Sequence, residues 1–231
     1  FVPWDDDCDV ALYRSEYEKL IEALKTDTLS DGFYYYDIKK RKNDHFHDFA
    51  DRIFYTKEVY REDDIYRDTY DGLYKYLWLD IFVLDDVVES YKKTNYLKLK
   101  MCYGLAMGHR VHIDYSDYKS IIQKIEVFVL STIGKLYKMD DIIKIYHDIV
   151  SDNIKHKKDS EDIKNVYYAN YPIKWIEYEL PKKNEEYIYT EFEDTLLPIN
   201  KNYDETLSIL YGDYMTLPDE KDRHPEHIDI F

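Results

Sequence analysis

Hydrophobic residues in the first third of the chain form short runs whose length and alternation predict β-strands. The predicted strands are Asp9 to Leu12, Phe33 to Ile38, Arg52 to Val59 and Leu77 to Leu84. The last run is almost wholly apolar, and we expect it to stop at the acidic pair Asp85 and Asp86. The polar stretch from Lys39 to Asp51 predicts a loop, and the alternation in Tyr187 to Phe192 predicts one later strand.

Helical spacing of apolar residues follows the first strand. Tyr17, Leu20, Ile21 and Leu24 share one helical face, and Ser15 with Glu18 has the pattern of a capping box. A second such pattern, Asn202 with Glu205, predicts a short helix through Tyr211. Gly212 is expected to end that helix in a left-handed turn.

The middle of the chain, from about Val87, is typical of consecutive helices. Ser116 is the predicted N-cap of a helix with apolar residues at Ile121, Ile122, Ile125, Phe128, Val129, Ile133 and Leu136. A second helix carries an amphipathic stripe at Met139, Ile142, Ile143, Tyr146, Ile149 and Val150. The two stripes predict a packed helical pair, followed by a charged loop from Lys155 to Lys164.

Together these elements predict an α+β fold, with a small mixed sheet flanked by helices and a helical second half. The length of 231 residues fits one domain or one core with an elaborated second half. We therefore expect a core over residues 1–86 and a helical and C-terminal portion over residues 87–231 that packs on it.

Charge and composition narrow the classes of function. The formal net charge is −16, a field that repels phosphate backbones and predicts no nucleic-acid partner. It would also repel an anionic membrane surface, unless the basic residues cluster. No apolar run approaches the roughly 20 residues of a membrane span. Two cysteines, Cys8 and Cys102, form no disulfide framework, so a reducing, cytoplasmic location is expected.

The strongest candidate for chemistry is the acidic opening of the chain, PWDDDCDV. Side chains alternate along an extended segment, so Asp5, Asp7 and Asp9 share one face. The Cα atoms of Asp7 and Asp9 are then ~6.6 Å apart, close enough for both carboxylates to lean toward one magnesium ion. The alternative is a solvated acidic turn.

Asp80 is a second candidate, because it is the one charged residue in LWLDIFVL. A buried carboxylate is costly unless it is paired. It can complete a magnesium site suited to phosphoryl transfer if its strand lies beside the first. The alternative is a structural ion pair with an arginine such as Arg14 or Arg52.

Three ordered motifs give these carboxylates a context. The segment FVPWDDDCDVALYRSEYEKL, the strand LDIFVLDD and the closing segment NYDETLSILYGDYMTLP, within residues 202–218, are similar to the hallmarks of the LicD family. That family belongs to the nucleotidyltransferase-like superfamily and includes phosphocholine transferases and fukutin-type transferases. The resemblance implies a nucleotidyltransferase-like core with Mg²⁺ (or Mn²⁺).

The resemblance also implies roles for individual residues. Asp7, Asp9 and Asp80 match the catalytic and metal-binding aspartates. Arg14 matches a family arginine and is expected to reach a donor phosphate, with a salt bridge to Glu18 as the alternative. Weaker candidates for substrate binding are Trp4, Tyr211 and Asp213.

The implied activity is transfer of a phospho-alcohol such as phosphocholine from a CDP-linked donor, for example CDP-choline, to a sugar of a lipopolysaccharide, teichoic acid or capsule. Peripheral membrane association through a lipid-linked acceptor is compatible with it. Alternatives are another nucleotidyltransferase acting on a small molecule, or a non-catalytic glycan- or metal-binding remnant. The superfamily's Gly-Gly turn, which precedes the aspartates, is missing here. We therefore expect the fold to lack its N-terminal part and this piece alone to be weakly active or inactive.

Overall fold

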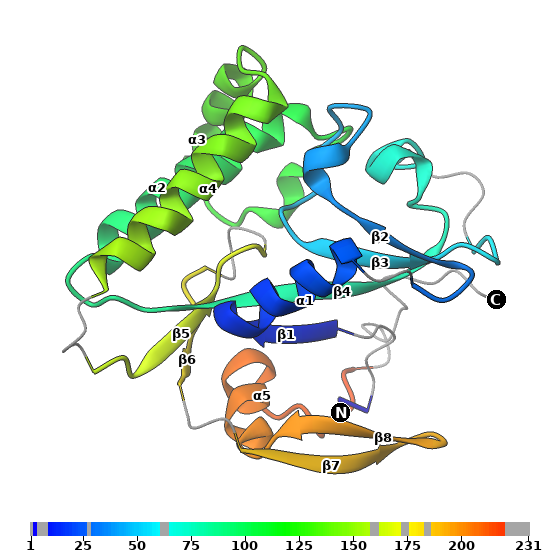
Figure 1. The fold of residues 1–231 in the computed structure, drawn as a ribbon. Coiled ribbons are helices and arrows are strands. Elements are labelled where there is room, and N and C mark those ends of the chain that lie inside the picture. The colour runs from blue at the N-terminus through cyan, green and yellow to red at the C-terminus, as the bar shows by residue number, and fades with distance from the viewer. Residues whose placement is uncertain are drawn as a thin grey trace.

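The computed structural model describes residues 2–3, 9–26, 29–60, 65–157, 162–171, 176–182 and 186–219. In these ranges it confirms the predicted mixture of helices and strands (Figure 1). The strands are β1 Asp9–Tyr13, β2 Phe33–Tyr36, β3 Asp51–Tyr55, β4 Leu77–Asp86, β5 Asn165–Tyr168, β6 Glu179–Pro181, β7 Tyr187–Phe192 and β8 Thr195–Asn200. The α-helices are α1 Arg14–Thr26, α2 Lys92–Ala106, α3 Ile121–Gly134, α4 Met139–His156 and α5 Tyr203–Tyr211. Short 3₁₀ turns are η1 Ile38–Lys40, η2 Thr69–Gly72, η3 Met107–His109 and η4 Tyr115–Asp117.

Strand β4 is the centre of the main sheet. The order β2-β3-β4-β5-β6 is antiparallel throughout, and β1 adds to β4 in parallel. Strands β7 and β8 form a separate hairpin, which lies below β1 in Figure 1. The sheet is mixed, as predicted. The sheet contains strands from both sides of the predicted boundary between residues 86 and 87, because β5 and β6 come from the second half of the chain. The division of the chain at that boundary stays a prediction.

Alternation along β4 gives the sheet two chemically different faces. Trp78, Asp80 and Phe82 point to one face, called here the Asp80 face. The intervening residues, including Val83 and Asp85, point to the opposite face, called the Asp85 face. The positions of functional side chains follow from this alternation.

The largest core cluster involves the helical layer of α2 and α4. It includes Leu99, Tyr103, Ile142 and Tyr146, together with Tyr167, which lies opposite Asp85 in the register of β4 and β5. On the Asp80 face a smaller cluster contains Phe82 and Tyr168 and receives Leu210 of α5 (Figure 1). Helices therefore cover the two faces unequally: among the described residues, the Asp80 face receives the short α5 and the 3₁₀ turn η2, whose Tyr70 packs in one cluster with Trp78.

Several predicted element boundaries are wrong, and for β4 the reason is electrostatic. Strand β4 continues through Asp85 and Asp86 because both carboxylates find cations, Arg14 for the first and Lys157 with Lys182 for the second. Strands β2 and β3 are shorter than predicted, since they end at Tyr36 and Tyr55.

The capping patterns correctly predicted that helices would form, but the predicted residues do not cap them. Helix α1 begins at Arg14, so Ser15 lies inside its first turn instead of capping it. Helix α3 is capped by Ser120 in a full capping box with Gln123, whereas Ser116 lies in η4. Helix α5 is confirmed at Tyr203–Tyr211, although Asn202 makes no side-chain capping bond.

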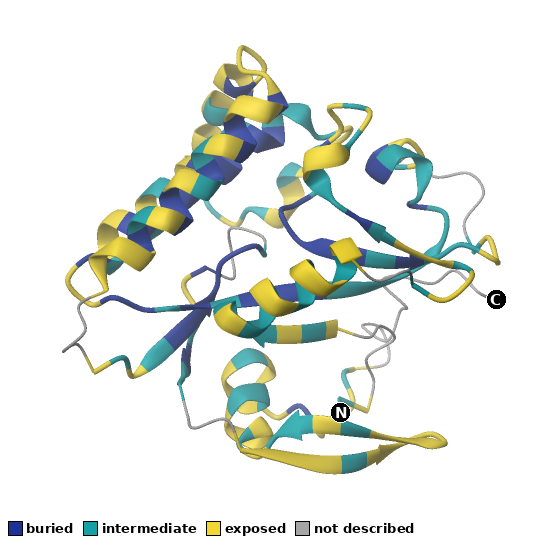
Figure 2. Ribbon diagram, viewed as in Figure 1, coloured by how far each residue is buried: buried dark blue, intermediate teal, exposed yellow. Residues whose placement is uncertain are grey.

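The prediction of a packed helical pair is right for α4 and wrong for α3. All six stripe residues of α4, from Met139 to Val150, are buried. The seven apolar residues predicted for the first helix are all exposed, from Ile133 at 41% to Leu136 at 84%. Helix α3 instead turns Val127, Ser131 and Gly134 inward. Exposed residues on the outward side of the helical layer can be followed in Figure 2.

Candidate active site

Strand register places two carboxylates side by side on the Asp80 face. Asp9, the first residue of β1, is the parallel partner of Asp80 on β4. On the other side of β4, Arg52 of β3 is the antiparallel partner of Asp80. Adjacent strands are about 4.8 Å apart, so Asp9, Asp80 and Arg52 form one row across three strands. Asp7 and Trp4, the other candidates from the opening motif, lie outside the described residues.

Asp80 is held in a partly buried position between an arginine and an indole. Its Oδ1 lies 2.5 Å from Arg52 Nε, yet neither atom has an aligned hydrogen-bond partner among the described residues. Trp78 Nε1 donates to Oδ2 at 3.3 Å. Burial raises the pKa of Asp80, against the opposing charge of Arg52. A buried carboxylate oxygen without an aligned donor is unusual in folded proteins, and a bound ion is one arrangement that satisfies such an oxygen.

Arg52 is the hub of this row and is almost fully buried, with 3% of its side chain exposed. Its two terminal nitrogens donate to both oxygens of Asp48, at 2.7 and 2.8 Å. Burial raises the pKa of Asp48, but the Arg52 charge outweighs it, with help from hydrogen bonds, and holds the pKa well below its usual range. Asp48 and Asp80 therefore place two carboxylates around one permanent cation, and Asp9 lies beyond Asp80 on the neighbouring strand.

A strained turn supplies the aromatic cover of Arg52. The Arg52 guanidinium lies 4.6 Å from the ring centre of Tyr70, a favourable cation–π arrangement. Tyr70 and Asp71 have φ of 53° and 58°, a left-handed conformation that costs about 1–2 kcal/mol per residue. Asp71 offsets part of this cost by accepting hydrogen bonds from the backbone N–H groups of Lys42 and Asn43.

Tyrosines from the second half of the chain surround the acidic pair. Burial raises the pKa of Tyr171, and Asp9, Asp48, Asp80 and Tyr211 raise it further, which places its hydroxyl near the row. The pKa of Tyr168 is raised by burial, and then by Tyr211 and Asp9. Tyr211 of α5, a sequence candidate, and Asp9 thus both lie within electrostatic range of Tyr168.

The turn after α5 has a structural role. Gly212 ends the helix with φ 71° and ψ −123°, a conformation that favours glycine. Asp213 Oδ2 accepts from the hydroxyl of Thr216 at 2.7 Å, and the Tyr214 hydroxyl donates to Asp204 at 2.7 Å. The structure therefore engages Asp213 in its own turn, and Tyr211 is the member of the closing motif that lies within electrostatic range of Tyr168.

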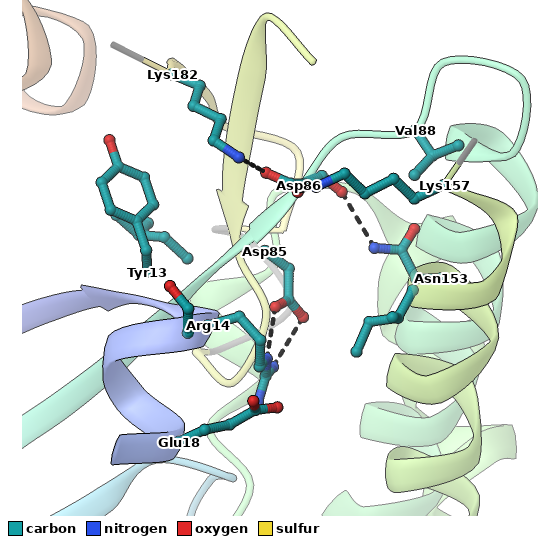
Figure 3. Close-up of a pocket in the computed structure, with 12 residues that line it drawn as sticks. Tyr13, Arg14, Glu18, Asp85, Asp86, Val88, Asn153, Lys157 and Lys182 are labelled. Atoms are coloured by element: carbon teal, nitrogen blue, oxygen red, sulfur yellow. Dashed lines mark hydrogen bonds and ion pairs between the residues drawn. The ribbon is translucent and has the colours of Figure 1, made fainter. Parts of the chain in front are cut away.

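Arg14 lies away from the acidic pair. It follows the end of β1, five residues after Asp9, a distance of roughly 16 Å along a strand. Its guanidinium forms two hydrogen bonds to Asp85, at 2.7 and 2.8 Å. This pair is seen in Figure 3 beside a cavity of about 280 Å³ that Lys157 and Lys182 also line. The alternative prediction, a salt bridge from Arg14 to Glu18, is replaced by the bond to Asp85.

A larger cavity of about 480 Å³ lies on the Asp85 face, between α1, β2 and α4. Asp51 lines it and accepts hydrogen bonds from the hydroxyl groups of Tyr17 and Tyr35. Burial raises the pKa of Asp51 to about 6, although the Tyr17 bond opposes this shift. This cavity is on the opposite side of the sheet from Asp9 and Asp80.

The residues present fit a divalent cation in part. In the described ranges no group of three or more His, Cys, Asp or Glu side chains has the arrangement of a metal site. Asp9 and Asp80 supply two neighbouring carboxylates, however, and Mg²⁺ commonly takes one or two from a protein together with substrate phosphates. The Oδ1 atom of Asp80, which has no aligned hydrogen-bond donor in the part of the chain that the structure describes, is suited to be one of these carboxylate ligands.

No helix in the described part has the length and apolar character needed to cross a bilayer.

Sequence reasoning missed much of the surroundings of Asp80. It named Arg14 or Arg52 as an alternative ion-pair partner for Asp80, and the structure shows the pair with Arg52. His47 lies in the polar stretch that was predicted to be a loop, and in the structure its Nδ1 lies 2.9 Å from Asp48 and its ring packs against Tyr70. Asp48 and Tyr171 lie in loops with no pattern that marks them.

The fold and this site define a class of protein: an α+β protein with paired acidic residues on adjacent strands of a mixed sheet. No protein-family model and no solved structure matches the chain. The lipopolysaccharide cholinephosphotransferase LicD of Haemophilus influenzae is 26% identical over 247 aligned residues, which cover 99% of this chain and 80% of that protein. The chain is therefore similar to this protein over nearly its whole length.

Proposed function

We propose that the chain is a LicD-family phosphotransferase that moves phosphocholine, or a related phospho-alcohol, from a CDP-linked donor to a sugar of a cell-surface glycan such as lipopolysaccharide. The observation that carries the proposal is the parallel register of Asp9 and Asp80. This register brings together carboxylates from two motifs that are far apart in the sequence. The same two motifs are similar to hallmarks of the LicD family. The relative's name, which includes lipopolysaccharide and cholinephosphotransferase, supports the acceptor and the transferred group.

In the proposed reaction an acceptor hydroxyl attacks the β-phosphorus of the CDP-alcohol. A new oxygen–phosphorus bond forms, the bond to the bridging oxygen breaks, CMP leaves, and the hydroxyl loses its proton. Asp9 and Asp80 would hold a Mg²⁺ or Mn²⁺ ion, with Asp7 as a third proposed ligand. When bound, the metal stabilises negative charge on the phosphate.

The protein side chains orient this reaction. Arg52, fixed by Asp48, holds the Asp80 carboxylate in one position. Tyr171, whose pKa is influenced by Asp9 and Asp80, and Tyr211 of the closing motif are proposed to contact the substrate. Trp4 and Asp213 remain weaker substrate-binding proposals, and Arg14 would reach a donor phosphate only if the donor extends along β1 from Asp9.

The proposal is tested with the full-length natural protein. CDP-choline, CDP-ribitol and CDP-glycerol are offered with Mg²⁺ and a glycan acceptor, and the product mass identifies the transferred group. We expect Asp9→Asn and Asp80→Asn each to lower kcat at least about 100-fold, as loss of a major electrostatic contribution to the transition state does. The control is Asp152→Asn, whose carboxylate forms an exposed ion pair with Lys98 on the helical layer.

Two outcomes would count against the assignment. Full turnover by both site variants would remove Asp9 and Asp80 from the chemistry. A product carrying a nucleotide monophosphate would favour a different nucleotidyltransferase. Circular dichroism shows whether each variant is folded, so that a loss of turnover is not mistaken for a loss of structure.

A further inference from the structure

Helix α3 turns its large apolar side chains toward the solvent, whereas a typical surface helix buries them. Its inward side is made of Val127, Ser131 and Gly134, the residues of α3 that are buried. Its outward side carries large apolar residues, all exposed: Ile121, Ile122, Ile125, Phe128, Val129 and Ile133, with Leu136 just beyond the helix end. Monomeric soluble proteins rarely leave a contiguous apolar surface of this kind, and such surfaces mark interaction sites.

Close backbone packing fixes α3 in this orientation. A Cβ atom at Gly134 would lie 1.9 Å from the carbonyl oxygen of Leu105 in α2. One at Gly108 would lie 2.4 Å from the carbonyl oxygen of Ser131. These glycines let the helices approach so closely that the small side of α3 must face α2. The large apolar residues of α3 therefore lie on its outer surface.

The charge around α3 is opposite to that of the whole chain. Residues 91–138 contain nine lysine or arginine residues and three acidic ones, although the complete chain has a net charge of −16. Lys124 and Lys135 are about three helical turns apart, so they lie along the same edge of the apolar surface. Lys119 and Lys138 flank α3 at its two ends.

The pairing of the lysines differs between α2 and α3. On α2, Lys92, Lys98 and Lys100 form ion pairs with acidic residues. Among the ion pairs of the described residues, none involves Lys119, Lys124, Lys135 or Lys138. The cations beside the apolar surface therefore remain available to an anionic partner.

We propose that the outer surface of α3, with its flanking lysines, docks on the surface of an anionic lipid bilayer. Apolar residues on one side of a helix and lysines at its edge are the properties of a helix that lies in the membrane interface. A second copy of this chain fits less well, because a twofold contact between antiparallel copies of α3 would bring the two lysine edges close to each other, whereas an anionic surface pairs with them. The inference does not rest on the proposed transferase activity.

The test measures binding of the full-length protein to vesicles of phosphatidylethanolamine and phosphatidylglycerol by co-sedimentation. Vesicles of phosphatidylcholine alone give the neutral comparison. We expect binding to the anionic vesicles that weakens with added salt. The triple variant Ile122→Gln, Phe128→Gln and Leu136→Gln should lower the partition coefficient at least about 100-fold, since each buried apolar side chain contributes about tenfold.

Two further variants separate the apolar and the electrostatic parts. Replacing Lys124 and Lys135 with Gln should weaken binding to anionic vesicles about fivefold per lysine and leave binding to neutral vesicles unchanged. The matched control replaces Val59 and Ile65 with Gln. These apolar residues are also exposed, at 50% and 62%, but lie between β3 and β4. The control should bind like the wild type.

Three results would overturn the proposal. The first is no binding of the wild type to anionic vesicles, and the second is equal binding by the triple variant. The third is a dimer in solution that the triple variant converts to a monomer without any vesicle binding, which would make α3 an interface between copies. Transfer to a water-soluble acceptor should be the same for wild type and triple variant, so failure of docking and failure of the proposed activity are distinguishable.

Discussion

Replacing Arg52 with methionine should destabilise the protein severely, because it leaves two carboxylates without their cation. Asp48 is 2% exposed and accepts both of its charged hydrogen bonds from Arg52. Asp80 is 13% exposed and has its Oδ1 against the same guanidinium. Removing one member of a buried ion pair costs about 3–5 kcal/mol. This is a large part of the roughly 5–15 kcal/mol that stabilises a typical domain.

The assay is urea unfolding, followed by circular dichroism, at neutral and at acidic pH. In the wild type the pKa of Asp48 lies below its unfolded value, so its stabilising contribution is present above that value and is lost as pH falls. In Arg52→Met, burial without a cation raises the pKa of Asp48. The variant's deficit should therefore be greatest at neutral pH and shrink as pH falls toward about 4, where the unfolded carboxyl groups are protonated.

Arg41→Met is the matched control. Arg41 is also buried, with 7% of its side chain exposed, but its partners Asp44 and Asp140 are 63% and 77% exposed. Water can solvate those carboxylates when the arginine is removed, so we expect a loss of about 1 kcal/mol or less. The account of the Arg52 hub is refuted if Arg52→Met costs no more than Arg41→Met, or if its deficit does not depend on pH.

Two further predictions concern the packing of α3 on α2 and the buried carboxyl group of Asp51. Gly134→Ala should lower the free energy of unfolding in urea by about 1–3 kcal/mol, because the new Cβ meets the Leu105 carbonyl and forces α3 away from α2. The control Thr132→Ala, on the outward side of α3, should change stability little. Equal effects of the two variants would contradict the packing argument. The folded pKa of Asp51, about 6, lies above its unfolded value, so stability should fall as pH rises from about 4 to about 6. Tyr17→Phe removes a hydrogen bond that favours the charged carboxylate and should raise this pKa further, whereas an unchanged or lower carboxyl pKa in an NMR titration would contradict it.

The sequence alone determined the elements with clear periodicity. Strand β7 is where its alternation predicts, and the buried stripe of α4 follows the helical repeat from Met139 to Val150. The apolar run around Asp80 indicated a strand and a carboxylate that needs a partner. These features depend on local spacing, which a single sequence displays directly.

Only the tertiary structure decided which surfaces those elements bury and which charges meet. The apolar residues of α3 predicted a buried stripe, but Gly108 of η3 and Gly134 of α3 allow a close contact on the opposite side of the helix. Asp85 and Asp86 looked like a strand end, yet cations distant in sequence keep them within β4. The row of Asp9, Asp80 and Arg52 likewise depends on register between strands up to 71 residues apart in sequence, and periodicity within one segment carries no information about its register with another.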